Sequence, residues 1–136
     1  MNLQPHLQKL RKGFTLVELS VVIGVLIALT TIGVFFSSAI GDWQAGKEAS
    51  ETLRGVYVAQ KSYLADHPTT QVVNLTNDML IPYLPDNSDT MPQVEGLDGT
   101  MKNIKVSVSP PVVVNGDGSA YDPSGNTSDS LWDVGE

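Results

Sequence analysis

The feature that most constrains the fold is an apolar run near the start of the chain, residues 14–40, which contains one charged residue, Glu18. As an α-helix, these 27 residues would measure about 40 Å, and the hydrocarbon core of a bilayer is about 30 Å thick. A helix buried in a soluble protein rarely runs this long without a polar face. The run therefore predicts a single transmembrane helix.

Charges on the two sides of the run predict its orientation. Basic residues precede it, and acidic residues follow it: Lys9, Arg11 and Lys12 before, Asp42, Glu48 and Glu51 after. Basic flanks stay on the cytoplasmic side of a membrane. We therefore expect the N-terminus in the cytoplasm and the C-terminal part outside.

Beyond the run, the helical pattern continues but becomes amphipathic. Apolar and neutral residues recur at spacings of three and four: Ala49, Leu53, Val56, Gln60 and Tyr63, with Leu64 alongside. No proline stands between Pro5 and Pro68. The pattern predicts one helix from residue 14 to about residue 65, ended by His67 and Pro68. We expect its second half to pack against the rest of the chain through a set of apolar residues: Leu53, Val56, Tyr57, Tyr63 and Leu64.

Residues 67–136 are rich in turn residues and poor in apolar ones. A short helical turn is expected at residues 77–84 with an Asn or Asp cap, and strands at residues 104–108 and 112–114. The sequence Asn-Gly-Asp-Gly at residues 115–118 indicates a turn that returns the chain as a strand near residues 119–121.

The predicted fold class is α+β, with a long N-terminal helix and a small C-terminal head that contains a short antiparallel sheet. Four stretches are expected: residues 1–13, the helix at 14–40, its amphipathic continuation at 41–66, and the head at 67–136. The head has too few apolar residues for a core of its own. It should therefore need the helix in order to fold.

Composition excludes several classes of function. From residue 41 onward there are fourteen acidic residues against five basic ones, and such a domain repels nucleic acid. The chain has no cysteine, which excludes disulfides, thiolate metal sites and cysteine nucleophiles. Outside the first 13 residues His67 is the only histidine, and it stands before a proline at a helix end. We do not expect an enzyme.

A motif at the start of the run points to a family. The sequence Lys-Gly-Phe-Thr-Leu-Val-Glu at residues 12–18 resembles the prepilin signature of type IV pilins and type II secretion pseudopilins. The resemblance implies that a prepilin peptidase cuts between Gly13 and Phe14 and N-methylates Phe14. It also implies a structural function: an inner-membrane assembly platform polymerises the subunit, with itself and other pilins or pseudopilins, into a cell-surface or periplasmic filament.

The residue types agree with this resemblance. Gly13 has no side chain, so its backbone can lie close to the groups of a protease. An acid within a membrane-spanning helix, such as Glu18, is costly and usually functional. Cleavage after Gly13 would create an amine at Phe14, four residues before Glu18. We expect Glu18 to pair with the amine of a neighbouring subunit during assembly.

An oxygen-rich C-terminal tail supplies candidate calcium ligands, Asp117, Asp122 and Asp129. Major pseudopilins bind calcium in a C-terminal loop, but Asp is also an ordinary turn residue. No other cofactor is predicted.

Two other functions remain open from the sequence. Ser37-Ser38-Ala39 is a small-residue site at which signal peptidase could cut, which would make the chain a secreted protein that begins at Ile40. An uncleaved chain that keeps Met1 would instead be a membrane-anchored extracytoplasmic binding protein.

Overall fold

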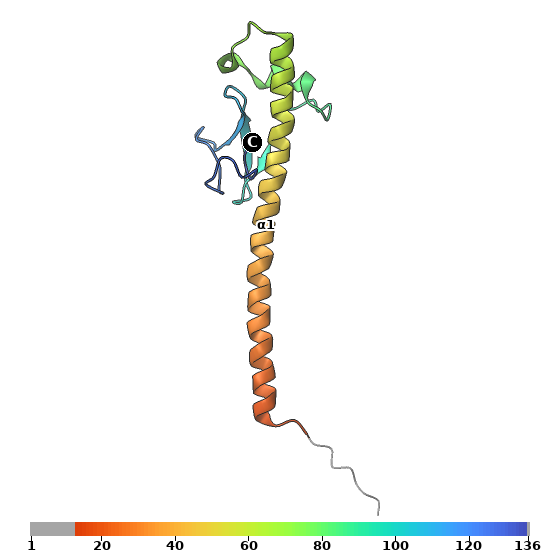
Figure 1. The fold of residues 1–136 in the computed structure, drawn as a ribbon, viewed down its shortest axis with the longest axis vertical. Coiled ribbons are helices and arrows are strands. Elements are labelled where there is room, and N and C mark those ends of the chain that lie inside the picture. The colour runs from red at the N-terminus through yellow and green to blue at the C-terminus, as the bar shows by residue number, and fades with distance from the viewer. Residues whose placement is uncertain (1–12, 136) are drawn as a thin grey trace, which may run out of the picture. The chain divides into compact units, whose positions relative to one another are not determined.

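The computed structural model describes residues 13–135, which divide into two compact units with the boundary after Ser38. One helix, α1 (Leu16–Asp66), runs through both (Figure 1). It begins two residues later than predicted and ends directly before His67 and Pro68. The α+β fold class is confirmed, because a small antiparallel sheet lies in the C-terminal unit.

In the first unit, α1 has no other element to pack against. Every residue from Gly13 to Ser38 is exposed, including large apolar side chains such as Phe35, at 77%. Among the described residues, α1 is the one helix long and apolar enough to cross a membrane. So much exposed apolar surface requires a cover of lipid or of other protein chains.

The second unit, from Ala39 onward, has one hydrophobic core to which α1 contributes a face. Ala49, Leu53 and Val56 are buried, as the periodicity predicts. They pack in one cluster with residues of the head: Leu75, Leu80, Leu84, Val94, Ile104, Val106, Val113 and Trp132. Residues 41–66 therefore belong to the same compact unit as the head.

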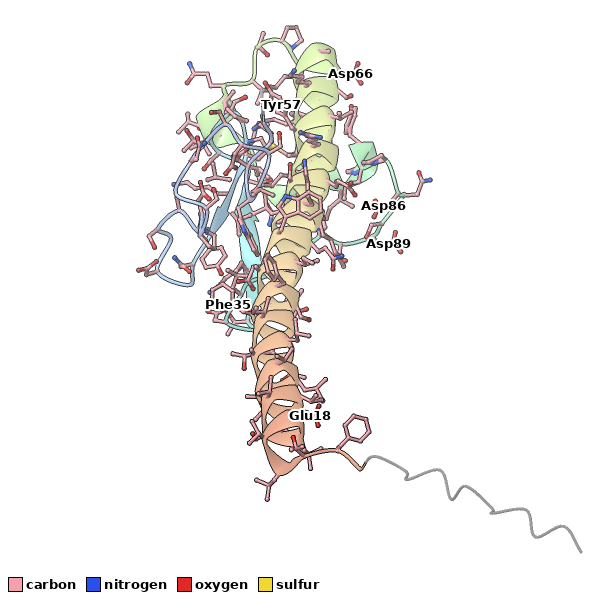
Figure 2. All side chains as sticks on the ribbon, turned by 60° about the horizontal axis from the view of Figure 1, so that its bottom comes forward. Glu18, Phe35, Tyr57, Asp66, Asp86 and Asp89 are labelled. Atoms are coloured by element: carbon pink, nitrogen blue, oxygen red, sulfur yellow. The ribbon has the colours of Figure 1, made fainter. Side chains whose placement is uncertain are left out.

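The prediction that Tyr57 packs in this core was wrong. Tyr63 and Leu64 are partly buried against the core, but Tyr57 is not among the residues that form it. Its ring instead lies beneath the ammonium of Lys61, with 4.1 Å from Nζ to the ring centroid. Tyr57 is half-buried at the edge of the buried face of α1. Figure 2 labels its position on α1.

Three short helical segments follow α1: η1 (Val72–Asn74), α2 (Asn77–Leu80) and η2 (Ile81–Tyr83). The last two together match the predicted helical turn. The expected Asn or Asp cap was wrong, because the N-cap of α2 is Thr76, whose side chain makes no capping hydrogen bond. Burial of Leu80 and Leu84 holds this segment in place instead.

The sheet has three antiparallel strands in the order β1 (Val94–Glu95), β2 (Met101–Lys105) and β3 (Val112–Val114). Strand β3 is as predicted, whereas β2 lies three residues earlier than the predicted strand at residues 104–108. The return strand near residues 119–121 is reduced to one bridge, between Val114 and Ala120.

The shift of β2 has a physical cause in Gln60. This side chain is fully buried, and its Nε2 donates hydrogen bonds of 2.8 Å to the carbonyls of Val106 and Val108. The carbonyls of Val106 and Val108 therefore accept hydrogen bonds from a side chain of α1 rather than from a neighbouring strand.

We expect Gln60→Leu to destabilise the second unit by roughly 1–3 kcal/mol, because the buried carbonyl of Val106 loses its donor. The matched control is Gln44→Leu, the same chemical change at an exposed position of α1, which should change the free energy of unfolding by no more than about 0.5 kcal/mol. Urea unfolding of a fragment covering residues 39–136 measures both. Equal stability of the two variants would show that Gln60 does not hold this loop.

The C-terminal segment also docks on α1, through a glycine. The backbone N–H of Trp132 donates to the carbonyl of Gly46 at 3.1 Å. A Cβ on Gly46 would lie 2.9 Å from the indole nitrogen of Trp132, so the missing side chain makes room for this ring. Farther along α1, Nε of Arg54 donates to the carbonyl of Val134 at 2.8 Å.

A fragment that begins at Thr70 should not fold, whereas one that begins at Ala39 should. The shorter fragment lacks Ala49, Leu53, Val56 and Ala59, which form one wall of the core, and each buried aliphatic side chain stabilises by about 1.5–3 kcal/mol. Circular dichroism during heating tests this. Cooperative melting of the shorter fragment would show that the head has a sufficient core of its own.

Candidate functional site

The motif residues lie where the chain enters α1. Gly13, Phe14 and Thr15 are outside the helix and exposed, Phe14 at 89%. Among the described residues other than its chain neighbours, none has an atom within 4 Å of the position that a Cβ on Gly13 would take. The bond between Gly13 and Phe14 is therefore open to another protein. Of the predicted leader, residues 1–12 lie outside the described part of the chain.

Thr15 and Glu18 close the first turn of α1 with reciprocal hydrogen bonds. The backbone N–H and the hydroxyl of Thr15 donate to Oε2 of Glu18, at 2.8 Å and 3.0 Å. The backbone N–H of Glu18 lies 3.1 Å from Oγ1 of Thr15. This is a capping box, which satisfies N–H groups that have no partner at a helix start. Figure 2 labels Glu18 at this end of α1.

Reasoning from the sequence missed the capping box, although the signal was present. A Thr followed three residues later by Glu, directly before an apolar run, is its usual pattern. The box gives Glu18 a role within its own chain besides the expected one in assembly. Its contacts use Oε2, which leaves Oε1 for a further partner.

Glu18 has no cationic partner within residues 13–135, where the one salt bridge joins Lys102 to Asp98. Its neighbours Val17, Leu19 and Val21 are apolar and exposed. When lipid or protein covers these side chains, the carboxylate loses water and needs a counter-charge. At 4 Å and an effective dielectric constant near 20, a single cation would supply about 4 kcal/mol of attraction.

The alternative cleavage site, Ser37-Ser38-Ala39, lies inside α1. Its hydroxyls are part of helical structure, since Oγ of Ser38 donates to the carbonyl of Phe35 at 3.0 Å. The two candidate cleavage sites thus differ, because Gly13 precedes the helix and Ala39 is within it.

The three calcium candidates each accept hydrogen bonds within a turn, and two of them share a donor, because the hydroxyl of Ser124 lies 2.6 Å from Oδ1 of Asp122 and 3.4 Å from Oδ1 of Asp129. Oδ1 of Asp117 accepts from the N–H and the hydroxyl of Ser119, at 2.9 Å and 2.6 Å. Asp122 accepts from Ser124 in the same way. Oδ1 of Asp129 accepts from the N–H of Leu131. In such Asx turns the side chain of Asp accepts from the backbone N–H two residues later, which is a structural use of Asp. Nowhere in residues 13–135 do three acidic or histidine side chains gather as metal ligands would.

Hydrogen bonds shift the pKa values of three side chains in the second unit, Asp98, Asp117 and Tyr83. The ammonium of Lys102, followed by the hydroxyl and N–H of Thr100, holds the pKa of Asp98 well below its ordinary value of 3.8. The hydroxyl of Ser119, followed by its N–H, lowers the pKa of Asp117. At the opposite end of the scale, donation of its hydroxyl to Asp66 raises the pKa of Tyr83 above 10.0.

These shifts predict how the stability of the second unit depends on pH. A lowered carboxyl pKa in the folded state means stability that is complete above the ordinary pKa of 3.8 and falls as the pH drops below it. A raised tyrosine pKa means stability that is complete below pH 10.0 and falls above it. We expect Asp98→Asn to reduce the pH dependence of stability only in acid, and Tyr83→Phe to reduce it only in alkali. Urea midpoints measured across pH check this, and unchanged slopes would contradict it.

No protein-family model matches this chain, and neither does a curated protein or a solved structure. Its function is therefore inferred from its own residues.

Proposed function

We propose that the chain is a structural subunit of a type IV pilus or of a type II secretion pseudopilus. A prepilin peptidase cuts it between Gly13 and Phe14 and N-methylates Phe14. The mature subunit is stored in the inner membrane with its N-terminus in the cytoplasm, and an assembly platform polymerises it into a filament.

One observation carries this proposal: the exposed Gly13–Phe14 bond stands directly before a capped apolar helix whose first turn holds its single acid, Glu18. A protease needs non-helical chain at the bond that it cuts, and Gly13 offers it no obstructing side chain. The new amine would appear at Phe14, within one helical turn of the acid in sequence.

The exposed apolar surface of residues 16–38 fits two environments in succession. Lipid covers it while the subunit is stored, and the same helices of neighbouring subunits cover it in the filament. Along the assembly, the amine of one subunit meets Glu18 of another, which neutralises both charges away from water. The acidic second unit remains outside the apolar core and is soluble there.

Calcium binding by Asp117, Asp122 and Asp129 stays a prediction. A binding site would require their turns to move together, so calcium should change the melting temperature of the fragment 39–136 more than magnesium does. Equal effects of the two ions would remove calcium from the proposal.

Assembly is tested by chemical cross-linking of intact cells that express the chain, with and without their prepilin peptidase. With the peptidase, we expect a ladder of homo-oligomers, whereas the precursor alone should stay monomeric because its amine is not free. A ladder of the same extent in both strains would separate oligomerisation from cleavage and contradict the proposal.

A further inference from the structure

The second unit begins with an exposed tryptophan, close to the end of the apolar run. Trp43 follows the last apolar residue of the run, Ile40, by three residues, and its side chain is 54% exposed. The other tryptophan, Trp132, is 4% exposed and lies in the core. Trp43 is thus not part of the core.

Its position along the chain places Trp43 at the level of lipid headgroups, if α1 spans the membrane as proposed. A hydrocarbon layer of about 30 Å takes about 20 residues, so a span that begins after Glu18 ends near Ser38. Trp43 is five residues farther, or about 7 Å. The headgroup layer extends about 5–7 Å beyond the hydrocarbon on each side. Tryptophan and tyrosine are the side chains that are enriched in this layer.

A second apolar side chain lies at the same end of the unit. Leu97, in the turn between β1 and β2, is 45% exposed. It lines a cavity of about 330 Å³ together with Gly41 and Asp42 of α1. The turn is well held, because the N–H of Leu97 donates to the hydroxyl of Tyr121 at 2.8 Å, and Gly96 and Thr100 are joined by a backbone hydrogen bond of the same length.

We propose that Trp43 and Leu97 bind the headgroup layer of the bilayer, so that the head of the stored subunit rests on the membrane surface. The inference depends on the proposed membrane-spanning role of α1. Acidic residues at this end of the unit, Asp42, Glu48 and Glu95, line the same cavity. They select a zwitterionic surface, because anionic headgroups repel them.

The absence of cysteine allows clean labelling. The full chain is reconstituted in phosphatidylcholine vesicles, with a single cysteine carrying an environment-sensitive fluorophore at Leu97→Cys. The matched control is Val73→Cys, an apolar position that is more exposed, at 67%, and lies in η1 beyond the far end of α1. We expect a blue shift of the label at position 97 and none at position 73. Equal spectra at the two positions would overturn the contact of Leu97 with the membrane.

Tryptophan emission tests the other contact. Lipids brominated near the headgroup should quench most of the emission of Trp43, and lipids brominated near the bilayer centre should quench less of it. Trp43→Phe leaves only the buried Trp132, so its emission should lose this sensitivity. The same fractional quenching in that variant, or none in the wild type, would overturn the inference.

Alkaline extraction of the vesicles separates this inference from the proposed function. A chain that is removed from the vesicles does not span them, which would contradict both. A chain that is retained, with Trp43 unquenched and the label at position 97 unshifted, would contradict the headgroup contact alone.

Discussion

Replacing Gly13 by leucine should leave the leader attached, so that the chain accumulates as a precursor 13 residues longer than the mature form. A branched side chain next to the cleaved bond keeps the peptidase from approaching the backbone. The substitution should not disturb the described part of the chain, where no residue beyond the chain neighbours of Gly13 lies within 4 Å of the position of the new Cβ. The loss of cleavage should be nearly complete, as measured by mass spectrometry of the membrane fraction.

The matched control is Gly24→Leu. Gly24 is also exposed, and among residues 13–135 nothing besides the nearby backbone of its own helix and its chain neighbours lies near its Cβ position, but it is inside α1. We expect normal cleavage of this variant. If both variants mature normally, or if both fail, Gly13 is not the residue that the peptidase reads.

Glu18→Leu should separate storage from assembly. The change makes the helix more apolar, so the protein should insert, and Gly13 is intact, so it should be cut. The amine of the incoming Phe14 would then be buried without a partner, which costs about 3–5 kcal/mol when one member of a buried pair is removed. We expect mature protein in the membrane and few or no filaments, as measured by electron microscopy at matched membrane levels.

The capping box supplies the variants that identify the cause. Glu18→Gln keeps a side chain that can cap the helix but removes the charge. Thr15→Val removes the hydroxyl of the box and keeps the charge. If Glu18 acts by pairing with an amine, Glu18→Gln should lose filaments and Thr15→Val should retain them. The reverse result would mean that Glu18 serves only to start its own helix.

Glu18→Asp tests the reach of the side chain. It keeps the charge but shortens the side chain by one carbon, so the carboxylate would meet the amine less closely. We expect fewer filaments than wild type but more than Glu18→Leu, in the same electron microscopy assay. A yield as low as that of Glu18→Leu would show that the position of the charge matters as much as its presence.

Most of α1 could be predicted, because its pattern is long and unbroken. An apolar run followed by a face at spacings of three and four determines one helix, and Pro68 determines its end. Strand β3 could also be predicted, because its three residues are all valine. Strand β1 was not, since two residues carry no periodic pattern.

The errors arise where one side chain replaces an expected local interaction. Residues 104–108 alternate as a strand does, yet Gln60, 46 residues or more away in sequence, takes the carbonyls of Val106 and Val108. Strand β2 instead includes Lys102, a charged residue buried beside Asp98 and the ring of Tyr121. No hydrophobic pattern reveals such a residue.

A glycine inside a helix lowers its stability, and the sequence indicates no other role for Gly46. The structure shows that Gly46 is the place where Trp132 approaches the helix. Two positions more than 80 residues apart make one contact, and neither indicates the other in the sequence. At the motif, by contrast, the residues of the candidate site are contiguous in sequence. Reasoning from the sequence could therefore name them, and it missed only that Thr15 caps the helix.

The central claim is that the mature chain begins at Phe14, and the mass of its N-terminal peptide tests this most directly. The chain is isolated from the membranes of the cells that make it and is digested for mass spectrometry. We expect an N-terminal peptide that starts at Phe14 and carries one methyl group on its amine. A chain that starts at Met1 or at Ile40 would contradict the claim.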